Sequence, residues 1–159
     1  DKIAEQNFHT LETMDLYRGL TPAVLSYEGI AFQYMAPAVF EDRQLAYVQK
    51  HLRILSAFYG VLEPMDGVTP YRLEMQAKVG IGDAKNLYDY WGERLYRSVI
   101  DDSRVIIKGT YAKMARGEMV RFMAEREIEN PEEIRKFDRL GYTFRRDLSS
   151  ESEYVFERK

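Results

Sequence analysis

Stretches with helical apolar spacing alternate with short apolar runs along this chain of 159 residues. Glu41–His51 carries Leu45 and Val48 at helical spacing, and the apolar run Leu52–Leu55 follows it directly. A helix that leads into a buried strand is typical of folds built from helix and sheet layers. The alternation therefore predicts a mixed α/β fold, with α and β layers in a single compact domain over residues 1–159.

The same periodicities predict the remaining elements. Helices are expected over residues 2–16, from Asn86 through Leu87, Trp91, Leu95 and Val99, over Thr110–Arg126, and from Asn130, where a cap residue precedes Pro131 and two acids. Strands are expected at Ala23–Tyr27, Leu52–Leu55 and Ser103–Ile107, with a terminal hairpin of Tyr142–Arg146 and Tyr154–Arg158. The segment Phe58–Pro70 is rich in Gly and Pro without being polar, which favours an ordered, packed loop.

The chain contains no cysteine, which excludes disulfides, thiolate metal sites and peroxidase chemistry based on its own thiols. His9 and His51 are the only histidines, and they lie far apart without the spacing of metal ligands. We therefore expect no cofactor and no metal site, and solvated or capping roles for both histidines.

No apolar run approaches the roughly 20 residues that a membrane-spanning helix needs, and the first residues do not have the order of a signal peptide. We expect a cytoplasmic protein that does not bind membranes. The net charge of −3 provides no overall attraction to nucleic acid, so any such binding requires a local basic surface.

One candidate for such a surface is the predicted helix Thr110–Arg126. Its apolar stripe consists of Tyr111, Ala115, Met119 and Phe122, and a second stripe consists of Lys113, Gly117 and Arg121, with Arg116 beside it. Ala112, Gly117 and Ala124 are small enough to let a phosphate backbone approach. The second stripe is thus predicted either to contact phosphates or to be the solvated face that any surface helix has.

A second candidate is the loop around Gly60 and the residues that follow it. Phe58–Val61 partly matches the glycine turn of a helix-hairpin-helix element, whose backbone N–H groups can bind a DNA phosphate, although Leu62 occupies the second glycine position. In an extended continuation, Arg72 and Glu74 lie on one face, as an Arg–carboxylate pair in a cleft or as a structural ion pair. No phosphate-binding loop, dinucleotide glycine pattern or nucleophile elbow occurs, so the residues alone provide no case for an enzyme.

Five stretches of the chain resemble the signature segments of the bacterial YaaA family, also called UPF0246. They are Leu52–Asp66, Pro70–Met75, Leu87–Gly92, Tyr111–Gly117, and Gly141–Tyr142 with Asp147–Ser150. The chain departs from the family pattern in two places. It lacks the first strand with a Ser-Pro-Ala-Lys-like motif, and Ile107 leads straight into Lys108 where the family has an Asn-Leu-Ala-Ser-like segment and more chain. We expect the domain to be incomplete at both places.

The resemblance implies a cytoplasmic protein of peroxide resistance, linked to limiting iron damage, which binds double-stranded DNA through a basic cleft and is not an enzyme. It implies an α/β fold that includes a helix-hairpin-helix element. By this likeness the DNA-contacting residues are Lys113, Arg116, Arg121, Arg72 and Gly60. The alternative is an enzyme acting on a nucleotide or base, with Arg72 holding a phosphate, Glu74 as acid or base, and Lys113 and Arg116 completing the pocket. An iron-binding protein is a third hypothesis, with no recognisable ligand set.

Overall fold

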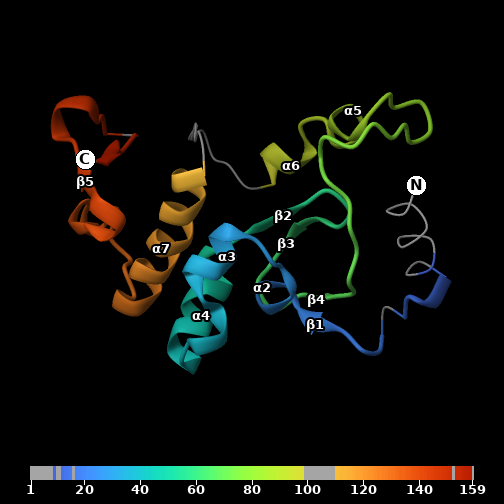
Figure 1. Cartoon of the computed structure of the whole chain (residues 1–159), viewed down its shortest axis with the longest axis horizontal. Helices are drawn as coiled ribbons and strands as arrows, with labels where there is room; N and C mark the ends of the chain where they lie inside the picture. The colour runs from blue at the N-terminus through green and yellow to red at the C-terminus, as the bar shows by residue number, and fades with distance from the viewer. Residues whose placement is uncertain (1–8, 10–11, 16, 99–109, 152, 159) are drawn as a thin grey trace. The chain divides into compact units, whose positions relative to one another are not determined.

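Figure 1 shows the computed structural model of the chain, which describes residues 9, 12–15, 17–98, 110–151 and 153–158. Helices and short antiparallel strands both occur, which confirms the predicted mixed α/β class. The chain forms two compact units, each built from two separate parts of the sequence: Asp1–Ser26 with Arg53–Asp101, and Tyr27–Leu52 with Asp102–Lys159. We call them unit 1 and unit 2 and describe each by itself; the single domain stays a prediction.

Unit 1 contains two small antiparallel sheets. Strand β1 (Thr21–Pro22) pairs with β4 (Gly67–Val68), and β2 (Ile54–Ser56) forms a hairpin with β3 (Gly60–Leu62). The strand predicted at Leu52–Leu55 is therefore present but begins two residues later. Its burial alternates, so that Ile54 is buried and Leu55 is exposed, because only one face of the hairpin packs inward.

The strand predicted at Ala23–Tyr27 is wrong, because Ala23–Ser26 forms the short helix α2. Ser26 Oγ donates to the Pro22 carbonyl at 3.1 Å, which closes this turn from within. Ala23 and Val24 are fully buried, and their N–H groups donate to the carbonyls of Asp66 and Pro64. A short buried apolar run has the same appearance in a helix and in a strand, so the sequence did not distinguish the two.

The predicted loop Phe58–Pro70 is ordered, but it includes strands β3 and β4. Ser56 Oγ accepts hydrogen bonds from the N–H groups of Phe58 and Tyr59 and fixes the hairpin turn. The Tyr59 hydroxyl lies 2.9 Å from Thr69 Oγ1 and accepts from the Thr69 N–H at 3.1 Å. These bonds join the two ends of the segment.

The helix predicted from Asn86 to Val99 begins as expected but is divided. Asn86 Oδ1 accepts from the Asp89 N–H at 2.9 Å, and α5 (Leu87–Trp91) ends where Gly92 adopts φ 48° and ψ −131°. Only glycine adopts this conformation readily, so the chain turns there and continues as α6 (Arg94–Arg97). Val99 lies outside the described residues.

Unit 2 contains the longest helix that the structure describes. Its elements are α3 (Ile30–Met35), η1 (Pro37–Val39), α4 (Asp42–His51), α7 (Thr110–Arg126), η2 (Pro131–Lys136), η3 (Arg139–Gly141), β5 (Tyr142–Phe144), η4 (Arg146–Leu148) and β6 (Phe156–Arg158). The predicted helices at Glu41–His51 and Thr110–Arg126 are confirmed, and so is the terminal hairpin, in which β5 pairs with β6.

The helix predicted from Asn130 starts at the expected cap, where Asn130 Oδ1 accepts from the Glu132 N–H at 3.0 Å. It continues as the 3₁₀ helix η2 for six residues and not as an α-helix. Phe137 ends it and is buried against Phe122 and Ile128.

Helix α7 is packed on two sides within unit 2. Phe122 faces Phe137 and Ile128, whereas Gly117 faces α3. A methyl group at Gly117 would overlap the Ala31 carbonyl oxygen and lie 2.9 Å from the Met35 nitrogen. The expectation that the stripe containing Gly117 points away from the core is therefore wrong at this position, because α3 covers it.

Two further predictions cannot be compared with the structure. The strand at Ser103–Ile107 and most of the helix over residues 2–16 lie outside the described residues.

We expect Gly117→Ala to destabilise the protein by about 2 kcal/mol or more, because the new methyl group meets helix backbone that cannot rotate away. Urea unfolding followed by circular dichroism measures this change. Gly29→Ala is the matched control, since a methyl group there has no atom within 4 Å and the backbone is extended. A loss no larger than that of the control would show that α3 and α7 are not in close contact.

Candidate functional site

Lys113 and Arg116 are the exposed cations of the first half of α7. They are three residues apart, so their side chains leave neighbouring positions on one side of the helix. Neither forms an ion pair with a carboxylate in the part of the chain that the structure describes. The predicted exposure of these two residues is confirmed, and both are available to bind an anion.

Arg121, the third cation of the predicted stripe, has a different environment. Its Nε donates to Glu125 at 2.9 Å, and Glu125 also pairs with Arg139. Arg139 in turn binds Glu118 at 3.0 Å, so that two cations and two carboxylates form a half-buried cluster along α7 and η3. The charge of Arg121 is thus largely compensated within unit 2.

This cluster shifts the pKa values of Glu125 and Arg139. Burial alone would raise the pKa of Glu125, but hydrogen bonds from Arg139 and Arg121 outweigh it and lower the pKa below its usual value of 4.5. Burial would likewise lower the pKa of Arg139, but hydrogen bonds to Glu125 and Glu118 raise it. Both shifts favour the charged forms of Glu125 and Arg139, whose ion pair joins η3 to α7.

Two of the three small residues of α7 do not leave room for a phosphate backbone. Gly117 is in contact with α3, and Ala124 is fully buried with Tyr47 and Val48 of α4. Ala112 is half-buried. Gly117 and Ala124, where the sequence suggested that a phosphate backbone could approach, are instead covered by helices of the same unit.

In unit 1, Arg72 and Glu74 are exposed on an extended segment between β4 and α5. Tyr71, Leu73 and Met75 are half-buried, which confirms the predicted alternation of the two faces. Arg72 and Glu74 belong to unit 1, and the cations of α7 belong to unit 2. That these four residues form one site stays a prediction.

Gly60 lies at the start of β3 with φ 87°, a conformation that favours glycine. A methyl group there would come within 2.9 Å of Trp91 Cη2, and Trp91 Nε1 donates to the Ala57 carbonyl at 2.9 Å. Phe58–Val61 is thus the turn and first part of a β-hairpin, and the helix-hairpin-helix element is not confirmed. The glycine allows Trp91 to pack on the hairpin.

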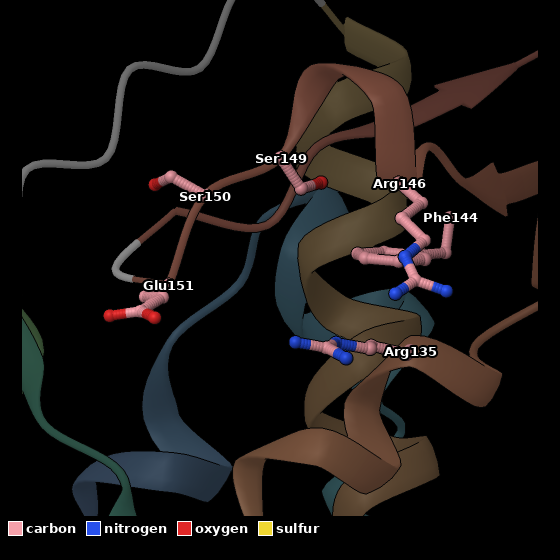
Figure 2. Close-up of a pocket in the computed structure, with 6 residues that line it drawn as sticks. All are labelled: Arg135, Phe144, Arg146, Ser149, Ser150 and Glu151. Carbon is pink, nitrogen blue, oxygen red and sulfur yellow. The ribbon is translucent and has the colours of Figure 1, made fainter.

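A shallow pocket of about 280 Å³ in unit 2 was not found from the sequence. It is lined by Arg135, Phe144, Arg146, Ser149, Ser150 and Glu151, which Figure 2 shows as sticks. These residues come from η2, β5, η4 and the segment after η4, so no single stretch reveals it. The adjacent arginines at 145 and 146, followed by two serines, were the available signal.

The described residues contain neither a metal-ligand cluster nor a helix that could span a membrane. Among the described residues, no three His, Asp or Glu side chains come together as they would around a metal ion. None of the helices in the same part of the chain has the length and apolar character that crossing a bilayer requires.

Comparisons with known proteins give a consistent result. The family model "Peroxide stress protein YaaA" matches residues 1–108 and 100–148. A UPF0246 protein of Agathobacter rectalis is 67% identical over 195 aligned residues, which cover 100% of this chain and 78% of the relative. UPF0246 proteins of Lachnoclostridium phytofermentans and Lactiplantibacillus plantarum are 48% and 44% identical, over 98% of this chain and 75% and 77% of the relatives.

The alignment with the Agathobacter rectalis protein is longer than the chain, with 195 positions against 159 residues. That relative therefore carries internal residues that have no counterpart here. The two ranges that match the family model overlap at residues 100–108. Both observations favour the expected discontinuity after Ile107, which stays a prediction.

The stability of unit 2 is expected to depend on pH through Glu125. Because its pKa is lower in the folded protein, its contribution is complete above about pH 4.5 and is lost as pH falls through the folded pKa. Glu125→Gln should therefore destabilise the protein near pH 7 and remove part of the acid-induced loss of stability. Urea unfolding at several values between pH 7 and 3 measures both effects.

Glu28→Gln, at an exposed carboxylate away from the cluster, controls for the loss of one negative charge. The prediction fails if Glu125→Gln and Glu28→Gln have the same pH profile.

Proposed function

Because the chain belongs to the peroxide stress protein YaaA family, we propose that it binds double-stranded DNA in the bacterial cytoplasm through the exposed cations of α7. In this proposal the protein contributes to peroxide resistance as a binding protein and not as an enzyme. The single observation that carries the DNA-binding part is the exposure of Lys113 and Arg116 without an ion-pair partner among the described residues.

The net negative charge of the chain supports a DNA contact that involves only a few phosphates. Acidic residues outnumber basic ones, 26 to 23, so a general attraction to DNA is absent. A long basic side chain that no carboxylate neutralises can still reach a phosphate and release its counterion. We therefore expect weak binding without base specificity, in which each bound cation adds about 0.9 to the salt slope.

The other predicted contacts differ in how strongly the structure supports them. Arg121 would have to leave Glu125 to bind a phosphate, so its contribution should be small. Arg72 is exposed in unit 1 and remains a proposed second contact. Gly60 lies beneath Trp91, which favours a structural role for this glycine over phosphate binding.

The absence of cysteine supports a role that does not consume peroxide through thiol chemistry. The alternative function, an enzyme acting on a nucleotide or base, needs Arg72 and Glu74 in a cleft that excludes water. Both side chains are exposed on an extended segment, so the described geometry favours the binding protein.

The test is the salt dependence of binding to a fluorescent 20-base-pair duplex, measured by anisotropy between 50 and 200 mM NaCl. We expect Lys113→Ala with Arg116→Ala to weaken binding at 50 mM NaCl by about tenfold or more, and to lower the slope of log affinity against log salt by up to about 1.8. Thermal unfolding should be unchanged, because both side chains are exposed.

The matched control is the double variant Arg43→Ala, Lys50→Ala, which removes the same charge from unit 2. These cations pair with Glu41, Glu127 and Glu129, so we expect binding within about twofold of the wild type. Binding that does not depend on salt, an absence of binding, or an equal loss in both double variants would contradict the proposal.

A further inference from the structure

The pocket of Figure 2 brings together two guanidinium groups, two serines and one aromatic ring. The figure shows the guanidinium groups of Arg135 and Arg146 beside the Phe144 ring, and the Glu151 carboxylate turned away from them. The volume of about 280 Å³ is slightly below the range of pockets that bind drug-sized ligands. It suits a small group with several hydrogen-bond acceptors.

Arg135 is held in position before any ligand binds. Its guanidinium carbon lies 4.8 Å from the centre of the Tyr154 ring and 5.3 Å from that of Phe144, within cation–π range. Its Nη1 pairs with Glu132 at 2.5 Å, and Glu132 also accepts from the Tyr154 hydroxyl at 2.9 Å. The charge of Arg135 is thus compensated, and its planar group is oriented.

Arg146 is the second cation of the pocket, which Glu151, turned away from it in Figure 2, also lines. The preceding residue, Arg145, pairs with both Asp147 and Glu157. Arg146 is exposed and has no carboxylate partner among the residues that the structure describes. Because Arg135 already pairs with Glu132, Arg146 is the pocket cation without an ion pair among the described residues, and it lies beside a second, oriented guanidinium.

The chain around the two serines is fixed by hydrogen bonds. Ser149 Oγ donates to the Arg145 carbonyl at 2.6 Å and accepts from the Val155 N–H at 2.9 Å. The Ser150 N–H donates to the Glu153 carbonyl at 2.8 Å. The pocket wall therefore does not need to reorganise when a ligand enters, which lowers the cost of binding.

We propose that this pocket binds a single phosphate group, with Arg146 as the main cation and Arg135 as an oriented second donor. Guanidinium groups match the geometry of phosphate oxygens and bind them through paired hydrogen bonds. The phosphate can belong to a free phosphate ester or to the DNA backbone, since both present the same group. This site uses residues outside α7 and does not depend on the proposed DNA contact of Lys113 and Arg116.

The experiment follows the arginine Nε–H signals by NMR in the ¹⁵N-labelled full chain. The protein is titrated with inorganic phosphate, with deoxyadenosine 5′-monophosphate, and with a duplex whose 5′ ends carry no phosphate. Each titration is compared with sodium chloride at the same ionic strength. We expect the Arg146 and Arg135 signals to move, and Arg146→Ala to weaken binding of the ligand that moves them by about tenfold or more.

Two further variants separate a specific site from general attraction. Lys136→Ala removes a cation of η2 outside the pocket, which pairs with Glu133 at 4.0 Å, and should leave affinity within about twofold. Arg135→Lys keeps the charge but loses the planar donors, and should weaken binding several-fold. Both the exposed Arg146→Ala variant and the conservative Arg135→Lys variant should stay folded, as thermal unfolding will show.

The three ligands distinguish the source of the phosphate. If the Arg146 and Arg135 signals move with the small ligands, the phosphate belongs to a free phosphate ester. If they move with the duplex alone, it belongs to the DNA backbone. The same titrations in the Lys113→Ala, Arg116→Ala variant should still move the pocket signals, even if that variant has lost its DNA contact on α7. Signals that move no more than with chloride, equal losses in Lys136→Ala and Arg146→Ala, or loss of the response in the α7 variant would each overturn the proposal.

Discussion

The missing side chain at Gly117 is the constraint on which the arrangement of unit 2 depends. Because α7 carries no Cβ there, its backbone approaches Ala31 and Met35 of α3 directly. This contact fixes which side of α7 faces inward, and Phe122, on another side, then packs with Phe137 and Ile128. The C-terminal segment therefore folds against a helix whose orientation is already determined by its neighbour. A protein interior is too closely packed to absorb a methyl group at such a point.

The orientation of α7 also determines which of its charged side chains form ion pairs within unit 2. The side next to η3 holds Glu118 and Glu125, which Arg139 joins into one cluster with Arg121. Half-buried carboxylates need such partners, because a charge removed from water without one is costly. The cluster therefore uses Arg121 for the fold, whereas Lys113 and Arg116 are left with exposed side chains. Packing within unit 2 thus places Arg121 in an ion-pair cluster and leaves Lys113 and Arg116 exposed.

Local sequence signals predicted an element correctly where neighbouring residues determine its conformation. They failed where contacts with residues distant in the sequence determine it. Helix α7, the Asn130 cap and the terminal hairpin were predicted from nearby residues. The helix at Ala23–Ser26 was missed because burial, and not periodicity, produced its apolar run.

For the candidate site, the exposure of Lys113 and Arg116 was predictable. The cover on Gly117 comes from α3, and the partner that completes the Arg121 cluster, Arg139, lies beyond the helix. The apolar periodicity of α7 reveals neither the contact of Gly117 with α3 nor the ion pairs of Arg139.

Two cations of α7, Arg126 and Lys113, form no ion pair with the residues that the structure describes, and their surroundings differ. Arg126 ends α7, where the helix dipole favours a positive charge, and its guanidinium lies 4.0 Å from the centre of the Phe122 ring. Lys113 lies in the first half of the same helix, where the dipole disfavours a cation by a few tenths of a kcal/mol. The chain has more acidic than basic residues, so neutralising partners are not scarce. Neither the dipole nor an ion pair with a described carboxylate therefore stabilises a cation at this position, and its exposed side chain is solvated. An anion bound from outside the chain would compensate this charge, as the proposed DNA contact assumes.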